Sequence, residues 1–126
     1  MKTAIRIDVQ AVLTMTDGTR NVHDAVVAID TSATDLEQVE VDAVASIIAA
    51  SPRDVPDIDA ITLDWRPTTR QLDRPEVMAL LQHLIRNRAR YRFGPDRRGA
   101  LESRIAARAA LLPKNRDVET QPAITA

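Results

Sequence analysis

The sequence predicts an α+β protein in which a ββαβ unit, a small sheet covered by one helix, is followed by two amphipathic helices and an extended tail. Three observations support this fold class. The N-terminal residues alternate between polar and apolar side chains, which is the period of a half-buried strand. Apolar residues between positions 36 and 48 recur at helical spacing, and two later stretches with such spacing end near prolines. The length of 126 residues suits one domain.

The first two predicted strands cover residues 4–15 and about 21–30 and form a hairpin. A three-residue loop, 16–18, places Gly18 in the left-handed conformation, which is free of strain for glycine. A two-residue loop would shift the register by one and set Asp30 opposite an isoleucine, moving an apolar set to the wrong face. We therefore predict the pairs Met15/Thr19, Ile5/Ile29, Ile7/Val27 and Val9/Ala25.

A helix is predicted between Thr34 and Pro52. Thr34 and Glu37 form a capping-box pattern, and the proline ends the helix. Its apolar stripe consists of Leu36, Val39, Ala43, Val44, Ile47 and Ile48. A third strand follows at about 58–65, where Ile61, Leu63 and Trp65 point one way. The helix is expected to cover the apolar face of the resulting small sheet.

The second half of the chain is predicted to be helical. Residues 66–74 form a connector, and a helix begins beside Pro75 and runs to about Arg92, where Gly94-Pro95 interrupts it. The buried stripe of this helix is Val77, Leu80, Leu81, Leu84 and Ile85. A last helix, about 98–112, ends at Pro113. The predicted organisation is an acidic ββαβ domain at 1–65, the connector at 66–74, a basic helical region at 75–112 and an extended tail at 113–126.

Charge is unevenly distributed along the chain. Residues 1–65 hold four basic and twelve acidic groups, whereas residues 66–126 hold thirteen basic and six acidic groups, in a chain with net charge −1. Such an asymmetry points to binding between oppositely charged surfaces.

Several classes of function lack support in the sequence. There is no cysteine for disulfides or thiolate metal sites, and the three glycines form no phosphate-binding loop. No apolar run approaches the length of a membrane helix, and the N-terminus does not resemble a signal peptide. We therefore expect no catalytic residues, no metal, no cofactor and no membrane partner, and we predict a soluble cytoplasmic protein, or a virion component.

The most distinctive segment is arginine-rich and runs from Arg86 to Arg98. Its candidate interaction residues are Arg86, Arg88, Arg90, Tyr91, Arg92, Phe93, Arg97 and Arg98. Guanidinium groups bind phosphate, and interleaved aromatic rings can stack on bases, so one interpretation is a nucleic-acid surface. A second is docking onto an acidic protein surface, and a third is a solvated helix end. Alternate positions on a helix point about 200° apart, which weakens the idea of one DNA-facing stripe.

Three further side chains are candidates for a role in binding or catalysis. Trp65, the sole tryptophan, is a candidate interface anchor, although the lid of a small aliphatic core is the favoured interpretation. His23 and His83 have no catalytic or metal-ligand spacing around them and are expected at the surface or at an edge.

The function that these patterns favour is that of a non-enzymatic assembly or adaptor protein, acting through protein–protein contacts and forming homo-oligomers. A structural subunit of a large particle such as a virion would fit. The acidic half of one copy would then meet the basic half of the next, head to tail. The alternative is a small nucleic-acid-binding regulator that uses the Arg86–Arg98 segment on phosphates.

Overall fold

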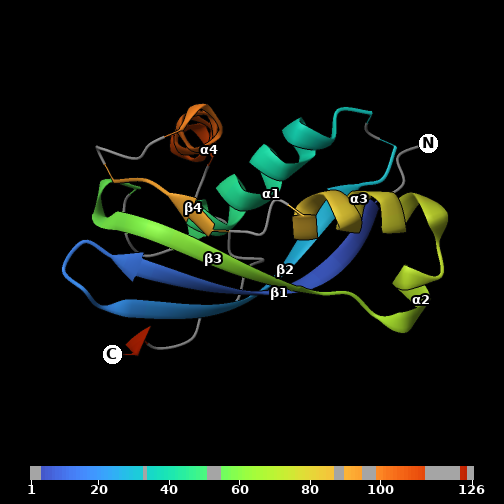
Figure 1. Ribbon diagram of the computed structural model, residues 1–126, viewed down its shortest axis with the longest axis horizontal. Helices are drawn as coiled ribbons and strands as arrows, with labels where there is room; N and C mark the ends of the chain where they lie inside the picture. The colour runs from blue at the N-terminus through green and yellow to red at the C-terminus, as the bar shows by residue number, and fades with distance from the viewer. Residues whose placement is uncertain are drawn as a thin grey trace.

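The fold combines one antiparallel sheet with its longer helices on a single face (Figure 1). A computed structural model of the chain describes residues 4–32, 34–50, 55–86, 90–94, 99–112 and 123–124. The strands follow the spatial order β4-β3-β1-β2-β5, and β5 is only two residues long. The elements in chain order are β1 (Ala4–Met15), β2 (Arg20–Asp30), α1 (Leu36–Ala50), the 3-10 turn η1 (Val55–Asp57), β3 (Ile58–Arg66), α2 (Thr69–Leu72), α3 (Pro75–Arg86), β4 (Arg90–Arg92), α4 (Ala100–Leu111) and β5 (Ala123–Ile124).

The β1–β2 hairpin has the predicted register. Ile5 pairs with Ile29 and Val9 with Ala25. The loop is closed by the Met15 N–H, which donates to the Thr19 carbonyl at 2.8 Å, and Gly18 has φ +88°. Only glycine adopts this conformation at low cost, so the turn sequence sets the register and thereby sends every odd-numbered residue of β1 to the buried face.

Helix α1 is capped one residue later than predicted, at Asp35 instead of Thr34. The Asp35 carboxylate, not the Thr34 hydroxyl, accepts the hydrogen bond from the Gln38 N–H at 3.1 Å. Glu37 does not complete a capping box, because its carboxylate pairs with Arg104 of α4. The helix is buried on more than one side, between the sheet and α4, and its buried residues are Val39, Glu40, Val41, Ala43, Val44, Ala45, Ile47, Ile48 and Ala49.

The second half departs from the prediction at the arginine-rich segment. The helix expected to reach Arg92 ends at Arg86, and residues 90–92 form strand β4, which pairs with Thr62–Ala60 of β3. The physical reason is the period: Tyr91 and Phe93 alternate with arginines, which suits a strand with one buried face. The last helix is α4, which begins at Ala100 rather than at Arg98.

The connector also contains structure that was not predicted. Thr68 and Gln71 form a reciprocal capping box at the start of the short helix α2. The Gln71 side chain also donates to the Arg6 carbonyl of β1 at 2.6 Å, so the connector is attached to the sheet.

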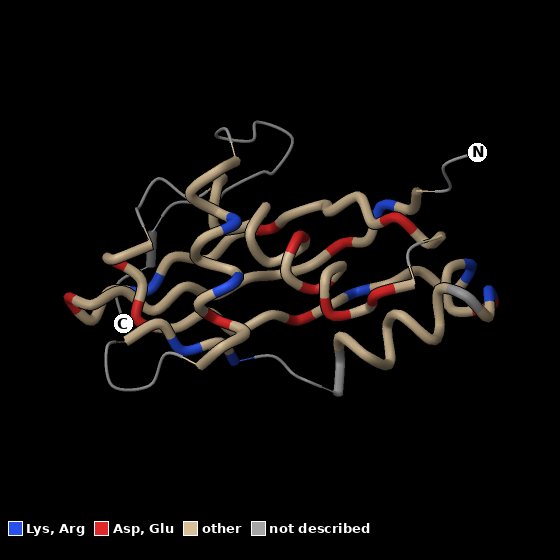
Figure 2. The backbone as a smooth tube through the Cα atoms, turned by 90° about the horizontal axis from the view of Figure 1, so that it is seen from above, with Lys and Arg blue, Asp and Glu red and all other residues tan. Residues whose placement is uncertain are grey.

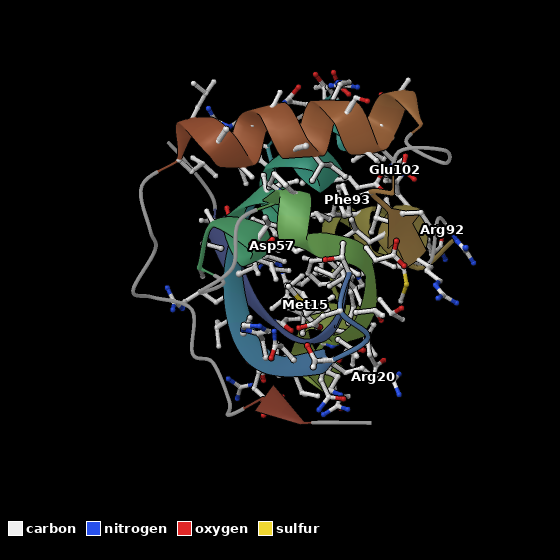
Figure 3. All side chains as sticks on the ribbon, turned by 90° about the vertical axis from the view of Figure 1, so that its left-hand side faces the viewer. Met15, Arg20, Asp57, Arg92, Phe93 and Glu102 are labelled. Atoms are coloured by element: carbon white, nitrogen blue, oxygen red, sulfur yellow. The ribbon has the colours of Figure 1, made fainter. Side chains whose placement is uncertain are left out.

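Both halves of the chain contribute to one hydrophobic core. The buried cluster joins side chains of β1, β2, β3 and α1 with Leu81 of α3, Tyr91 of β4 and Ile105 of α4. Figure 3 shows the sheet curving beneath the core and α4 lying across the top. The acidic and basic parts of the sequence are therefore packed against each other. No helix among the described residues is long and apolar enough to cross a membrane.

Candidate functional site

The structure separates the candidate residues of the arginine-rich segment. Arg90 is exposed and Arg92 is half-buried on β4. Tyr91 and Phe93 point into the core, where they are 3% and 5% exposed. These two rings are therefore buried and do not form a surface on which bases could stack. Arg86 ends α3, and the remaining candidates, Arg88, Arg97 and Arg98, lie outside the described residues.

Strand β4 forms one edge of the sheet, and α4 partly blocks this edge. The Phe93 N–H donates inward to the Asp59 carbonyl of β3 at 2.8 Å. The Arg92 N–H is directed to the other side, where the Glu102 carboxylate of α4 accepts it at 3.4 Å. Figure 3 shows Glu102 beside Arg92 at this edge. A side chain that occupies an outward N–H protects an edge strand against pairing with other chains.

A buried carboxyl group connects three elements of the fold. Glu40 of α1 is 0% exposed, which is rare for glutamate and requires polar partners. The Tyr91 hydroxyl of β4 donates to Glu40 Oε2 at 2.5 Å, and His83 Nε2 of α3 lies 3.2 Å from Glu40 Oε1. Burial, followed by the hydrogen bond to Glu40, raises the pKa of Tyr91 far above its ordinary value of 10.0, so the hydroxyl remains a donor at neutral pH.

Glu40 was not singled out from the sequence, although its position gave a signal. It lies four residues after Leu36 and four before Val44, in the middle of the apolar stripe of the helix. An acidic residue there must be buried with a partner. His83 is half-buried, with a side chain 26% exposed. The arrangement joins α1, α3 and β4 through the carboxyl group of Glu40.

Charges of the two halves also meet within the chain. Arg104 of α4 binds Glu37 and also Gln38 of α1, the latter at 2.9 Å, and Arg108 Nε lies 3.2 Å from Asp42 Oδ1. In Figure 2 basic and acidic positions are interspersed over the described chain instead of being divided into two ends. The arginines of α4 thus neutralise acidic residues of their own chain.

Two further predicted positions lie in the interior. His23, expected at the surface or an edge, is 1% exposed, because the odd-numbered residues of β2 face the core. Neither ring nitrogen has a hydrogen-bond partner in the described part of the chain, and burial lowers the pKa of His23. Trp65 is also buried, at 7% exposure, so its indole belongs to the core.

Strand β2 forms the opposite edge of the sheet. Among the described residues, the strand on its outer side is β5, which pairs with Arg20 and Asn21. Within the described chain, residues 22–30 of β2 therefore have no strand on their outer side. A hollow of about 360 Å³ borders this edge between residues 28–30 and α1, over apolar side chains that include Val39 and Ala43.

Among residues with a described position, no group of three or more His, Cys, Asp or Glu side chains is placed to hold a metal ion. Comparison with protein-family models found no match, and searches of curated proteins and of solved structures likewise found no match.

Proposed function

We propose that this protein is a non-enzymatic assembly protein that acts through protein–protein contacts, first of all with copies of itself. The observation that carries the proposal is the β2 edge at residues 22–30, beside which no strand lies in the part of the chain that the structure describes. An exposed row of backbone N–H and C=O groups is a template for another strand. β2 has neither a proline nor a bulge to protect it, and Val22 and Val26 are half-buried on its outer face.

The charge pairing within the chain weakens one possible mode of self-assembly. In that mode, the acidic half of one copy binds the basic half of the next, which requires positive charge at the surface of the second half. Arg104 and Arg108 instead bind Glu37 and Asp42 of the same chain, so α4 has less charge to offer a neighbour. Exposed pairs of this kind contribute at most about 1 kcal/mol each. The backbone edge of β2 is therefore a stronger basis for assembly than net charge.

Nucleic-acid binding remains the alternative, and exposed Arg90 is its main support among the described residues. Burial of Tyr91 and Phe93 removes the stacking part of the argument. What remains is attraction to phosphate, which carries no base specificity and weakens steeply with salt.

Two measurements distinguish the candidates. The native mass is measured by light scattering across a range of protein concentrations, and a gel shift with random duplex DNA is run at two salt concentrations. Assembly predicts a mass above 13.9 kDa and no salt-steep DNA binding. A 13.9 kDa monomer at every concentration refutes self-assembly.

The DNA-binding alternative needs its own control. It predicts salt-steep binding that is lost when Arg86, Arg88 and Arg90 are changed to alanine but retained in Arg70→Ala, because Arg70 is an exposed arginine on α2, outside the segment.

A further inference from the structure

Helix α1 has two buried faces, and only one of them is directed at the sheet. Ala43 faces the sheet, because it lines the hollow beside residues 28–29 of β2. Ala45 lies two residues further along, about 200° around the helix, and it is buried as well. Val41 and Ile48, about one turn before and after Ala45, share its side of the helix and are also buried. These three residues form a second apolar stripe, which an element other than the sheet must cover.

Among the described elements, α4 covers the second stripe. The helix lies as a further layer above α1, on the side away from the sheet (Figures 1 and 3). Arg104 of α4 pairs with Glu37, which borders the stripe on one side. Arg108 pairs with Asp42, which borders it on the other side. Ile105, next to Arg104 in α4, is buried in the core. The two ion pairs therefore hold α4 across the stripe.

The attachment of α4 is weaker than that of the layer beneath it. Of the twelve residues in α4, Ile105 and Ala109 are buried, whereas nine of the fifteen residues in α1 are buried. The N-cap of α4 is Gly99, which has no side chain to accept a hydrogen bond from the first turn. The ion pairs join exposed side chains, so water and salt screen them. A helix of this length is marginal in water without tertiary contacts, so α4 depends on these few.

We propose that α4 is a cover that opens from α1 as a unit while the sheet, α1 and α3 stay folded, and that salt favours the open form. Segments with few buried apolar contacts open at a lower free energy than the whole protein. The other contacts of α1 remain when α4 leaves, because Tyr91 and His83 hold Glu40 from β4 and α3. Opening uncovers the second stripe. The proposal is independent of assembly, because a monomer and an oligomer both contain α1 and α4.

Cysteine labelling measures the opening, because the chain has no cysteine of its own. Ala45→Cys places a thiol beneath α4, and Ala43→Cys is the matched control, with the same substitution in the same helix on the face toward the sheet. The reagent is iodoacetamide, which is uncharged, so salt does not alter its approach. In dilute salt Ala45→Cys should react at least about tenfold faster than Ala43→Cys, each rate being divided by that of the same variant unfolded in urea. Val41→Cys replaces Ala45→Cys if circular dichroism shows that the latter does not fold.

Salt and charge variants test how α4 is attached. Raising the salt concentration from about 0.01 M to about 0.5 M shortens the Debye length from about 30 Å to less than about 8 Å. Labelling of Ala45→Cys should rise at least about threefold over this range, because both ion pairs are screened. Adding Arg104→Gln and Arg108→Gln to this variant should give the fast rate already in dilute salt. Arg70→Gln is the matched control, because Arg70 is an exposed arginine on α2, far from α4 in Figure 1.

The outcomes are distinct from those that test assembly. Fast, salt-dependent labelling of Ala45→Cys alone supports the cover. Equal labelling of Ala45→Cys and Ala43→Cys means that α1 exposes both faces together, and this result overturns the proposal. Faster labelling of Ala45→Cys that does not respond to salt, or a salt response that survives the loss of both arginines, overturns the electrostatic attachment. A 13.9 kDa monomer would refute self-assembly without affecting the cover, and failure of the cover leaves assembly standing.

Discussion

Removing the Tyr91 hydroxyl tests whether the buried Glu40 connection holds the second half of the chain in place. Tyr91→Phe keeps the ring, which is 3% exposed in the core, and deletes only the donor that contacts Glu40 Oε2 at 2.5 Å. Glu40 has no exposure to water, so water does not replace the lost donor without rearrangement. His83 remains beside Oε1.

The expected cost follows from these contacts. A buried hydrogen bond of this kind is worth about 1–3 kcal/mol once its partner is left unsatisfied, so we expect Tyr91→Phe to lower the free energy of unfolding by ~2 kcal/mol. For a chain of this length, that corresponds to a fall in Tm of about 6–10 °C. Urea unfolding followed by circular dichroism measures the change directly.

A double-mutant cycle isolates the pair. Glu40→Met removes the acceptor and fills a similar volume, so Tyr91→Phe should cost at least about 1 kcal/mol less in that background than in the parent. The reasoning is refuted if Tyr91→Phe unfolds within about 0.5 kcal/mol of the parent, or if the two substitutions are additive.

Three other predictions concern separate features. Tyr91 is the only tyrosine, and burial together with Glu40 raises its pKa. The contribution of Tyr91 to the free energy of unfolding should therefore be complete below pH 10.0 and decrease as the pH rises above that value. In a pH titration, tyrosinate absorbance should appear only as the protein unfolds. Burial lowers the pKa of His23 below 6.5, so the stability of the protein should decrease as the pH drops below 6.5. His23→Leu should flatten this part of a plot of Tm against pH. An unchanged slope would show that other groups cause the pH dependence. Gly18→Ala should lower the free energy of unfolding by about 1 kcal/mol, because alanine is strained at φ +88° even though no atom lies near the added carbon. Gly18→Asn should lower it less, as measured by thermal unfolding. Equal stability of all three proteins would contradict the strain.

The elements that the sequence predicted best are those specified by neighbouring residues. The β1–β2 register follows from a turn glycine and a strict alternation, both of which lie within the segment itself. The prediction for the arginine-rich segment was wrong, because its arginines were placed at the end of a helix whereas residues 90–92 form strand β4. Their alternation with Tyr91 and Phe93 is the period of a strand, but three residues are too few for that pattern to outweigh the preceding helix without the neighbouring strand β3.

The amino-acid sequence by itself determined the mixed α+β composition, the hairpin register and the uneven distribution of charge along the chain, because each depends on local order or on a count. Tertiary structure decided what those charges meet: Arg104 and Arg108 bind acids of α1, and Glu40 meets Tyr91, fifty-one positions away in sequence. It also decided the order of the strands in the sheet, with β4 beside β3 and β5 beside β2. Contacts between distant residues depend on how the layers pack around one core, and a linear pattern does not encode the partner of a side chain that far along the chain.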